Sequence, residues 1–483
     1  MSTDRASGRA QGRSSRRQRA VRRRLRAYLL GFGAVIAALA IVGGLAAAVS
    51  VAVGPRVTNV HVDPAAAIAA SGARLIITTS QSLAEVDADQ VTVTPATPFQ
   101  VDTAGRTLGI RFTVPLDDST EYTVSIAGVT GVSGDVATTI TETFTTPASE
   151  IFLLQRGTAE GDTIFRTDLT GEQAVAVFAA DHIEDFRATA EHLVVWIDDA
   201  GTSSLIVTDL DGNDPQELPL PAEGYLSGLQ SADRGEQIGY LFTDADPSVE
   251  GALESALFTT SLNDPAAEPT RVAVAGVDER IAQWSFVPDT DSILLMTFDG
   301  ALMLTQADGA DPTAFGSALA IDGIAAGTSE AIIERLDGIY VLDLATGDES
   351  VLVPADTEGL EGAVLPIPGG ETVRTLYPVT AEGYPTGATE VAVVTAEGTA
   401  TVVYSAPATD ALLQTCVSPS GQYVAVLVAP GVADNPYDGY QLPLPETVET
   451  HIIEVSPEGG VAQEVVALTG FAISWCQTSV AWR

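Results

Sequence analysis

The chain has 483 residues, with 23 basic residues that are all Arg, 64 Asp or Glu, and only two Cys. Its length allows two to four domains. Ten of the Arg precede residue 27, so the rest of the chain carries 13 Arg against 63 acidic residues, a formal charge of −50. A surface of this charge repels nucleic acid and anionic lipid, so we expect no nucleic-acid partner.

Residues 27–53 read AYLLGFGAVIAALAIVGGLAAAVSVAV and contain no charged side chain. This run exceeds the roughly 20 residues that a helix needs to cross a bilayer, which predicts a transmembrane helix. Residues 1–26 are rich in Arg and have little to bury, so we expect a disordered basic tail. Because Arg resists translocation, the tail should stay in the cytoplasm and the C-terminal bulk should lie outside. A cleaved secretory signal is the alternative, but such signals have apolar cores of only about 7–15 residues.

Residues 56–147 contain short runs rich in Val, Ile, Thr and aromatic residues, separated by turn residues, which predicts a β-sandwich. The order VTNVHVDPAAA, VTVTP, LDDSTEYTVSIAGVTGVSGD and TFTTP resembles the bacterial Ig-like domain of S-layer and other surface proteins. The matching positions are Tyr122, Val124, Ile126, Gly128, Gly134, Phe144, Thr145 and Thr146. This resemblance implies a non-enzymatic extracellular spacer or adhesive module.

From residue 150 to 483, a pattern of apolar β runs and turns recurs in seven copies spaced 37 to 60 residues apart. All-strand periods of this size predict a β-propeller, here of about seven blades, with six or eight as alternatives. The runs IYVLDLATG and SPSGQYVAVLV resemble the blades of TolB-like and WD40-like propellers, although the Gly-His and Trp-Asp signature of WD40 repeats is absent. The last segment, FAISWCQTSVAWR, is typical of an opening strand, which the first copy lacks. Pairing the two chain ends in one blade would close the ring.

Few motifs for catalysis or cofactor binding are present. The four His have no zinc-site spacing and no Gly-x-Ser-x-Gly elbow occurs, so no cofactor is predicted. The oxygen-rich run Asp209, Asp211, Asn213, Asp214 and Glu217 is a weak candidate for Ca²⁺. Its Gly is misplaced for an EF-hand, and the same residue types favour an ordinary solvated turn.

Two further features are candidate functional or stabilising sites. The long segment from Pro430 to Glu449 contains Tyr437 and Tyr440, which we predict as binding residues, with an ordinary surface insertion as the alternative. Cys416 and Cys476 both follow the predicted span, so an extracytoplasmic disulfide between them is expected. The alternative is two separately buried thiols.

These features together predict an all-β, single-pass membrane protein that presents a β-propeller on an Ig-like stalk. Its expected function is binding or scaffolding, with an envelope protein or a wall polymer as the partner. The alternatives are an extracytoplasmic propeller enzyme acting on carbohydrate, such as a hydrolase or lyase, and a purely structural envelope component. The sequence alone identifies neither the ligand nor a catalytic residue.

Overall fold

A computed structural model of the chain describes residues 35–36, 54–132, 134–158, 161–199, 201–455 and 461–477. The helices within these ranges are too short or too polar to cross a membrane. The predicted tail at residues 1–26 lies outside the described residues, as does the predicted span at residues 27–53 apart from Val35 and Ile36.

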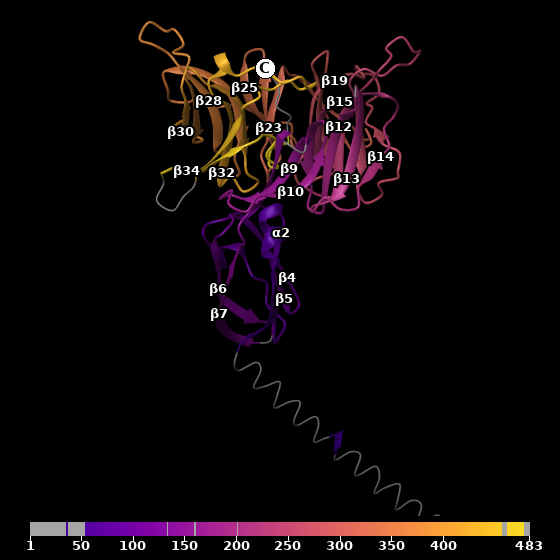
Figure 1. Cartoon of the computed structure of the whole chain (residues 1–483). Coiled ribbons are helices and arrows are strands. Elements are labelled where there is room, and N and C mark those ends of the chain that lie inside the picture. The colour runs from indigo at the N-terminus through magenta and orange to yellow at the C-terminus, as the bar shows by residue number, and fades with distance from the viewer. Residues whose placement is uncertain are drawn as a thin grey trace, which may run out of the picture.

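The strands from Val57 to Thr145 form two antiparallel sheets that share one apolar core (Figure 1). Alternate residues of these strands point inward, as in β5, where every second residue is buried. The short helix α2 (Pro64–Ala69) begins where the Asp63 carboxylate accepts a hydrogen bond from the Ala66 N–H, 3.1 Å away. The sheets are β1 (Val57–His61), β2 (Arg74–Thr79), β5 (Thr107–Phe112) and β4 (Phe99–Ala104), and β3 (Val91–Thr94), β6 (Glu121–Gly131) and β7 (Gly134–Thr145).

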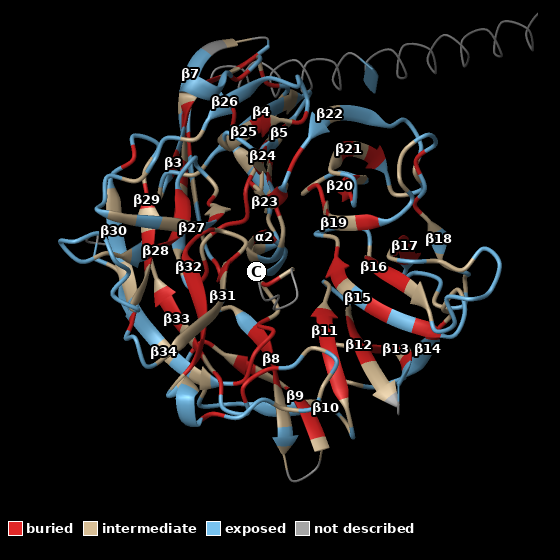
Figure 2. Cartoon of the chain, turned by 90° about the horizontal axis from the view of Figure 1, so that it is seen from above, coloured by how far each residue is buried: buried red, intermediate tan, exposed pale blue. Residues whose placement is uncertain are grey.

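The described strands from Glu150 onward form seven antiparallel sheets arranged in a ring, which is a β-propeller (Figure 2). Neighbouring sheets pack face to face, so a strand in the middle of a sheet is buried on both sides. This explains why β32 (Tyr423–Ala429), YVAVLVA, is buried at every position and reads as a continuous apolar run rather than an alternating one. Outer strands are largely exposed, as in β34 (Gln463–Thr469).

In chain order, the first sheet contains β8 (Glu150–Thr158), β9 (Gly161–Asp168) and β10 (Val175–Ala180). The second contains β11 (Ile183–Ala188), β12 (His192–Asp199), β13 (Thr202–Asp209) and β14 (Gln216–Leu218). The third contains β15 (Gly224–Ser231), β16 (Gln237–Asp244), β17 (Ala256–Ser261) and β18 (Thr270–Arg271). The fourth and fifth are β19 (Ile281–Phe286), β20 (Ser292–Thr297), β21 (Ala301–Gln306) and β22 (Thr313–Ser317); and β23 (Ala320–Ile324), β24 (Glu330–Arg335), β25 (Gly338–Asp343) and β26 (Glu349–Val351). The last two are β27 (Gly359–Pro366), β28 (Thr372–Pro378), β29 (Thr389–Val394) and β30 (Ala400–Ala406); and β31 (Ala411–Val417), β32 (Tyr423–Ala429), β33 (Glu449–Glu454) and β34 (Gln463–Thr469).

The ring is closed by the C-terminal segment, which pairs with the first sheet. Leu154 in β8 and Phe471 exchange both backbone hydrogen bonds, at 2.9 and 3.0 Å. The Ser474 N–H donates to the Phe152 carbonyl at 3.1 Å and extends the pairing. The prediction that the two chain ends meet in one blade is therefore confirmed. Closure therefore covers the edge of β8 that faces the centre of the ring.

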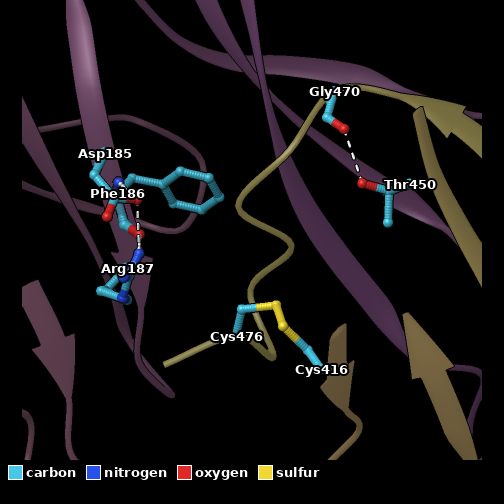
Figure 3. The surroundings of a disulfide bond; sticks show 7 residues. All are labelled: Asp185, Phe186, Arg187, Cys416, Thr450, Gly470 and Cys476. Carbon is cyan, nitrogen blue, oxygen red and sulfur yellow. Dashed lines mark hydrogen bonds and ion pairs between the residues drawn. A yellow bond between two sulfur atoms is a disulfide. The ribbon is translucent and has the colours of Figure 1, made fainter. Parts of the chain in front are cut away.

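The disulfide involves the same C-terminal segment (Figure 3). Cys416, in the inner strand β31, is bonded to Cys476 with a Cα–Cα distance of 5.5 Å, and both residues are buried. The pair joins the last complete sheet to the strand that completes the first one. It therefore fixes the ring at the place where the chain would otherwise open.

The two-sheet domain is held against one face of the ring, which we call the proximal face. The Asp118 side chain accepts hydrogen bonds from the Tyr423 hydroxyl and the Ser149 N–H, both at 2.8 Å, and its own N–H donates to Gln422 at 2.9 Å. Asp118 is 3% exposed, so this is a buried polar junction rather than a flexible contact.

Other contacts to the two-sheet domain come from loops that join the first and second strands of other sheets. Arg234 after β15 and Asp289 after β19 bond to Ser71, and Gly327 after β23 packs against Thr113. Loops of this type therefore all lie on the proximal face. The loops that join the second and third strands lie on the opposite face, which we call the distal face.

Candidate functional site

The long segment Pro430–Glu449 crosses the distal face, and we call it the strap. It leaves β32 and reaches over the first and second sheets. Its Tyr440 hydroxyl donates to the Asp162 carboxylate, with distances of 2.8 and 2.7 Å to the two oxygens. The Tyr440 ring stacks on His182 with centroids 3.9 Å apart, and the Arg156 guanidinium lies 3.8 Å from its centroid.

Hydrogen bonds from Arg156 and to Glu184 also hold the strap in place. Arg156 donates to Asp438 at 2.7 Å and to the Leu442 carbonyl at 2.9 Å. The Glu184 carboxylate, which is fully buried, accepts the backbone N–H groups of Gln441 at 2.9 Å and Leu442 at 3.1 Å. Burial and the hydrogen bond to Asp162 raise the pKa of Tyr440, so its phenol stays protonated and keeps donating. The strap therefore closes the ring a second time, through hydrogen bonds in which at least one partner is a side chain.

The two Tyr predicted as binding residues therefore have different positions. The polar and aromatic surfaces of Tyr440 are engaged within the protein, by Asp162, His182 and Arg156. Tyr437 is 48% exposed, and its backbone forms a bridge to Pro445 inside the strap. A partner of the distal face would meet Tyr437, whereas Tyr440 acts by holding the strap.

The weak Ca²⁺ candidate is a tight turn after β13. The Asp209 carboxylate accepts the N–H groups of Asp211 at 3.0 Å and Asn213 at 2.7 Å, and the Asn213 side-chain amide at 3.1 Å. The hydrogen bond from the Asn213 backbone lowers the pKa of Asp209, while Asp211 pairs with Arg166 at 2.8 Å. No group of three or more metal-ligating side chains occurs in the described ranges. The carboxylate oxygens of Asp209 and Asp211, which Ca²⁺ would need as ligands, instead form the hydrogen bonds and the ion pair that shape the turn.

Buried carboxylates in the propeller are also committed to partners. Asp162 accepts the N–H groups of Gly157 at 2.9 Å and Ile183 at 2.8 Å in addition to Tyr440. Asp185, on the inner strand β11, pairs with Arg187 at 2.7 Å, and both are 1% exposed (Figure 3). These carboxylates form hydrogen bonds and ion pairs with the inner strands and with the strap, as buried polar groups with a structural role do.

Exposed large apolar side chains are unevenly distributed over the described surface. The exposed Leu and Phe residues all lie on the distal face, as do the exposed Tyr residues, whereas exposed Val residues are mostly on outer strands or on the two-sheet domain. The distal set consists of Tyr225, Phe298, Leu319, Leu336, Leu360, Tyr377, Tyr384 and Tyr437. Clustered exposure of this kind marks an interaction surface, whereas scattered single residues do not.

Five of these residues lie on the distal side of three consecutive sheets, the fourth, fifth and sixth, and we call this set the apolar arc: Phe298, Leu319, Leu336, Leu360 and Tyr377. Phe298 is in the β20–β21 turn, where the Gly300 carbonyl accepts the Ala318 N–H at 2.9 Å and so brings Leu319 alongside. The Leu319 N–H donates to the Glu334 carbonyl at 2.8 Å, two residues before Leu336.

The sixth sheet contributes the other two residues of the apolar arc. Leu360 and Tyr377 are direct cross-strand partners in β27 and β28, and β27 packs beside β23 and β24. The arc and the strap occupy different parts of the ring, so the arc is left uncovered by the strap.

The apolar arc is not among the features predicted from the sequence, although the sequence contains a local signal for it. The turns Phe298-Asp299-Gly300 and Leu336-Asp337-Gly338 share one pattern in adjacent sheets. Tight turns favour Gly, Asn, Asp, Ser and Pro, so a large apolar residue in the same place of two turns needs another explanation. Read alone, each apolar residue simply extends the preceding β run.

Comparison with known proteins gives similarity of fold only. No family model and no curated protein matches the chain. Among solved structures, a putative TolB from Agrobacterium tumefaciens is 17% identical, with a TM-score of 0.38, covering 56% of this chain and 90% of that one. An oligogalacturonate lyase in complex with manganese is 13% identical, with a TM-score of 0.42, covering 70% and 94%. A prolyl endopeptidase is 12% identical, with a TM-score of 0.48, covering 77% and 50%. At these values none of the three carries an argument about activity.

Proposed function

We propose that this protein is a membrane-anchored extracytoplasmic binding or scaffold protein that presents its propeller on an Ig-like stalk. The uncharged run at residues 27–53 and the Arg-rich residues 1–26 support the anchor and its orientation. The partner is an envelope protein or a wall polymer that meets the distal face.

The two-sheet domain has features that support the Ig-like reading. Its two sheets enclose a single core, and Tyr122, near the start of β6, is 1% exposed. The Tyr122 hydroxyl accepts the backbone N–H of Asp117, five residues upstream, at 2.9 Å. Immunoglobulin-type sandwiches use a Tyr that bonds back to the preceding corner in a comparable way.

The observation that carries the proposal is the contrast between the two faces of the ring. The proximal face is occupied by the stalk through the buried Asp118 junction, whereas the distal face has all the exposed Leu, Phe and Tyr side chains of the described residues. A stalk fixed at one face directs the opposite face away from the membrane. Binding residues on such a scaffold are preorganised by the rigid sheets.

The proposal is tested with the full chain in its native membrane. A photo-crosslinking amino acid at Tyr384, which is 71% exposed on the β28–β29 loop, should capture a specific envelope component. The same probe at Val465 on the outer strand β34 is the matched control and should capture little. Protease added to intact cells should remove the propeller. Equal capture from both positions, or a propeller protected from protease, would contradict the proposal.

A further inference from the structure

We propose that the apolar arc docks a polypeptide segment in which apolar side chains are flanked by Lys or Arg. This inference rests on the proposed binding function and specifies the place and the chemistry of the partner. The arc consists of Phe298, Leu319, Leu336, Leu360 and Tyr377, and Leu336 is 91% exposed. Nothing in the described structure packs on this Leu to explain its presence in a turn.

The arc is held in place by polar contacts beneath it. The Thr297 hydroxyl accepts the Ala301 N–H at 3.0 Å and bonds to Asp299, which fixes the turn that presents Phe298. Arg335, next to Leu336, donates to the Phe315 carbonyl at 3.0 Å and also bonds to the Ser317 carbonyl, so the β24–β25 turn is tied to the end of β22. Apolar side chains on such fixed turns lose little entropy on binding, which favours their use as anchors.

The charges around the arc determine which partner fits. The two cations near it are neutralised within the protein: Arg280 pairs with Asp278 at 2.7 Å and with Glu254 at 3.6 Å, and Arg335 pairs with Glu349. The other exposed charged side chains in the turns and loops that carry the arc are acidic, namely Asp299, Asp337, Glu358 and Glu382.

These acidic side chains therefore favour a cationic partner and disfavour an anionic one. The whole chain after residue 26 has a formal charge of −50, so long-range attraction acts in the same direction. An anionic lipid surface or a teichoic-type polyanion would be repelled. A basic segment with Leu, Ile or aromatic residues would satisfy both the apolar arc and these acidic side chains.

The experiment uses the full chain in nanodiscs of zwitterionic lipid and three synthetic peptides of equal length as probes. One peptide has Leu and Lys, the second has the same Leu positions with Glu, and the third has the Lys positions with Ser in place of Leu. Fluorescence anisotropy should show that the Leu/Lys peptide binds at least tenfold more tightly than either of the others, and that its binding weakens as salt rises from about 50 to 300 mM.

The double variant Phe298→Ser/Leu336→Ser should weaken Leu/Lys binding at least tenfold. The matched control Val402→Ser/Val465→Ser, which removes exposed apolar side chains from outer strands, should leave it unchanged. Both variants change exposed residues, and equal melting temperatures will show that both fold. Equal binding of the Lys/Ser peptide, no effect of the arc variant, or arc-dependent binding to anionic vesicles would overturn the inference.

Failure of this inference is distinguishable from failure of the proposed function. If the photo-probe at Tyr384 still captures its partner in the Phe298→Ser/Leu336→Ser variant, the distal face binds but the arc is not the docking site. If no partner is captured by either the wild-type or the variant protein, the binding function itself is wrong.

Discussion

Removing the disulfide should destabilise the propeller at its closure. In the double variant Cys416→Ala/Cys476→Ala, the chain loses a covalent link between residues 60 positions apart. In the chain-entropy model a loop of this length contributes about 4 kcal/mol to the free energy of unfolding. Both positions are buried, so Ala is the replacement that leaves no unpaired polar group and no reactive thiol.

This loss of unfolding free energy can be converted into a shift of the melting temperature, Tm. For a propeller of roughly 330 residues, an unfolding entropy of about 2.1 cal/mol/K per residue gives about 0.7 kcal/mol/K, so a loss of 4 kcal/mol lowers Tm by about 6 °C. Local opening should precede this transition, because the closing segment is otherwise held by a few bonds, such as those between Leu154 and Phe471.

Three measurements check the reasoning. Calorimetry should show the lower Tm, and limited proteolysis should remove the C-terminal residues of the variant first. Mass spectrometry of the unreduced, alkylated wild-type protein should find no alkylated Cys. The control Val465→Ala, on the exposed strand β34, should melt like the wild type. A variant that melts within about 1 °C of the wild type and resists protease equally would refute this account of the closure.

Two further predictions concern the strap and the junction between the two-sheet domain and the ring. Tyr440→Phe removes a hydroxyl that donates to the buried Asp162 carboxylate, so we expect a loss of about 1.5–3 kcal/mol and faster hydrogen exchange in the strap. The control Tyr384→Phe, at a Tyr that is 71% exposed, should have little effect. Faster exchange in both variants, or in neither, would contradict the strap as a closure. Burial raises the pKa of Asp117 at the junction above its ordinary value, so ionisation of this carboxyl opposes folding. The stability that protonated Asp117 contributes at low pH is therefore lost as the pH rises through its pKa in the folded protein. Asp117→Asn should therefore raise Tm at pH 7 and leave it nearly unchanged at pH 4, and equal shifts at both values would show that the carboxyl does not titrate in this way.

The all-β class and the propeller could be predicted from the sequence because each depends on local patterns. A strand packed on both faces needs an unbroken apolar run, and seven such runs recur between turn signals. The final segment could be assigned to the first blade because it has an opening strand without a continuation. The chain has only two Cys, so their pairing could be predicted from their number and from the predicted extracytoplasmic location.

The strap and the apolar arc depend on tertiary structure. Tyr440 and Asp162 are separated by 278 residues, so no local pattern shows that this Tyr faces inward to a carboxylate. The arc arises because turns and strand ends from three adjacent sheets lie on the face of the ring opposite the two-sheet domain. Hydrophobic periodicity reports which residues can be buried within one element, whereas the exposure of Phe298 or Leu336 depends on whether another element covers it. The sequence thus determined the strands and the charge, and only the closed ring decided which side chains meet and which remain open to a partner.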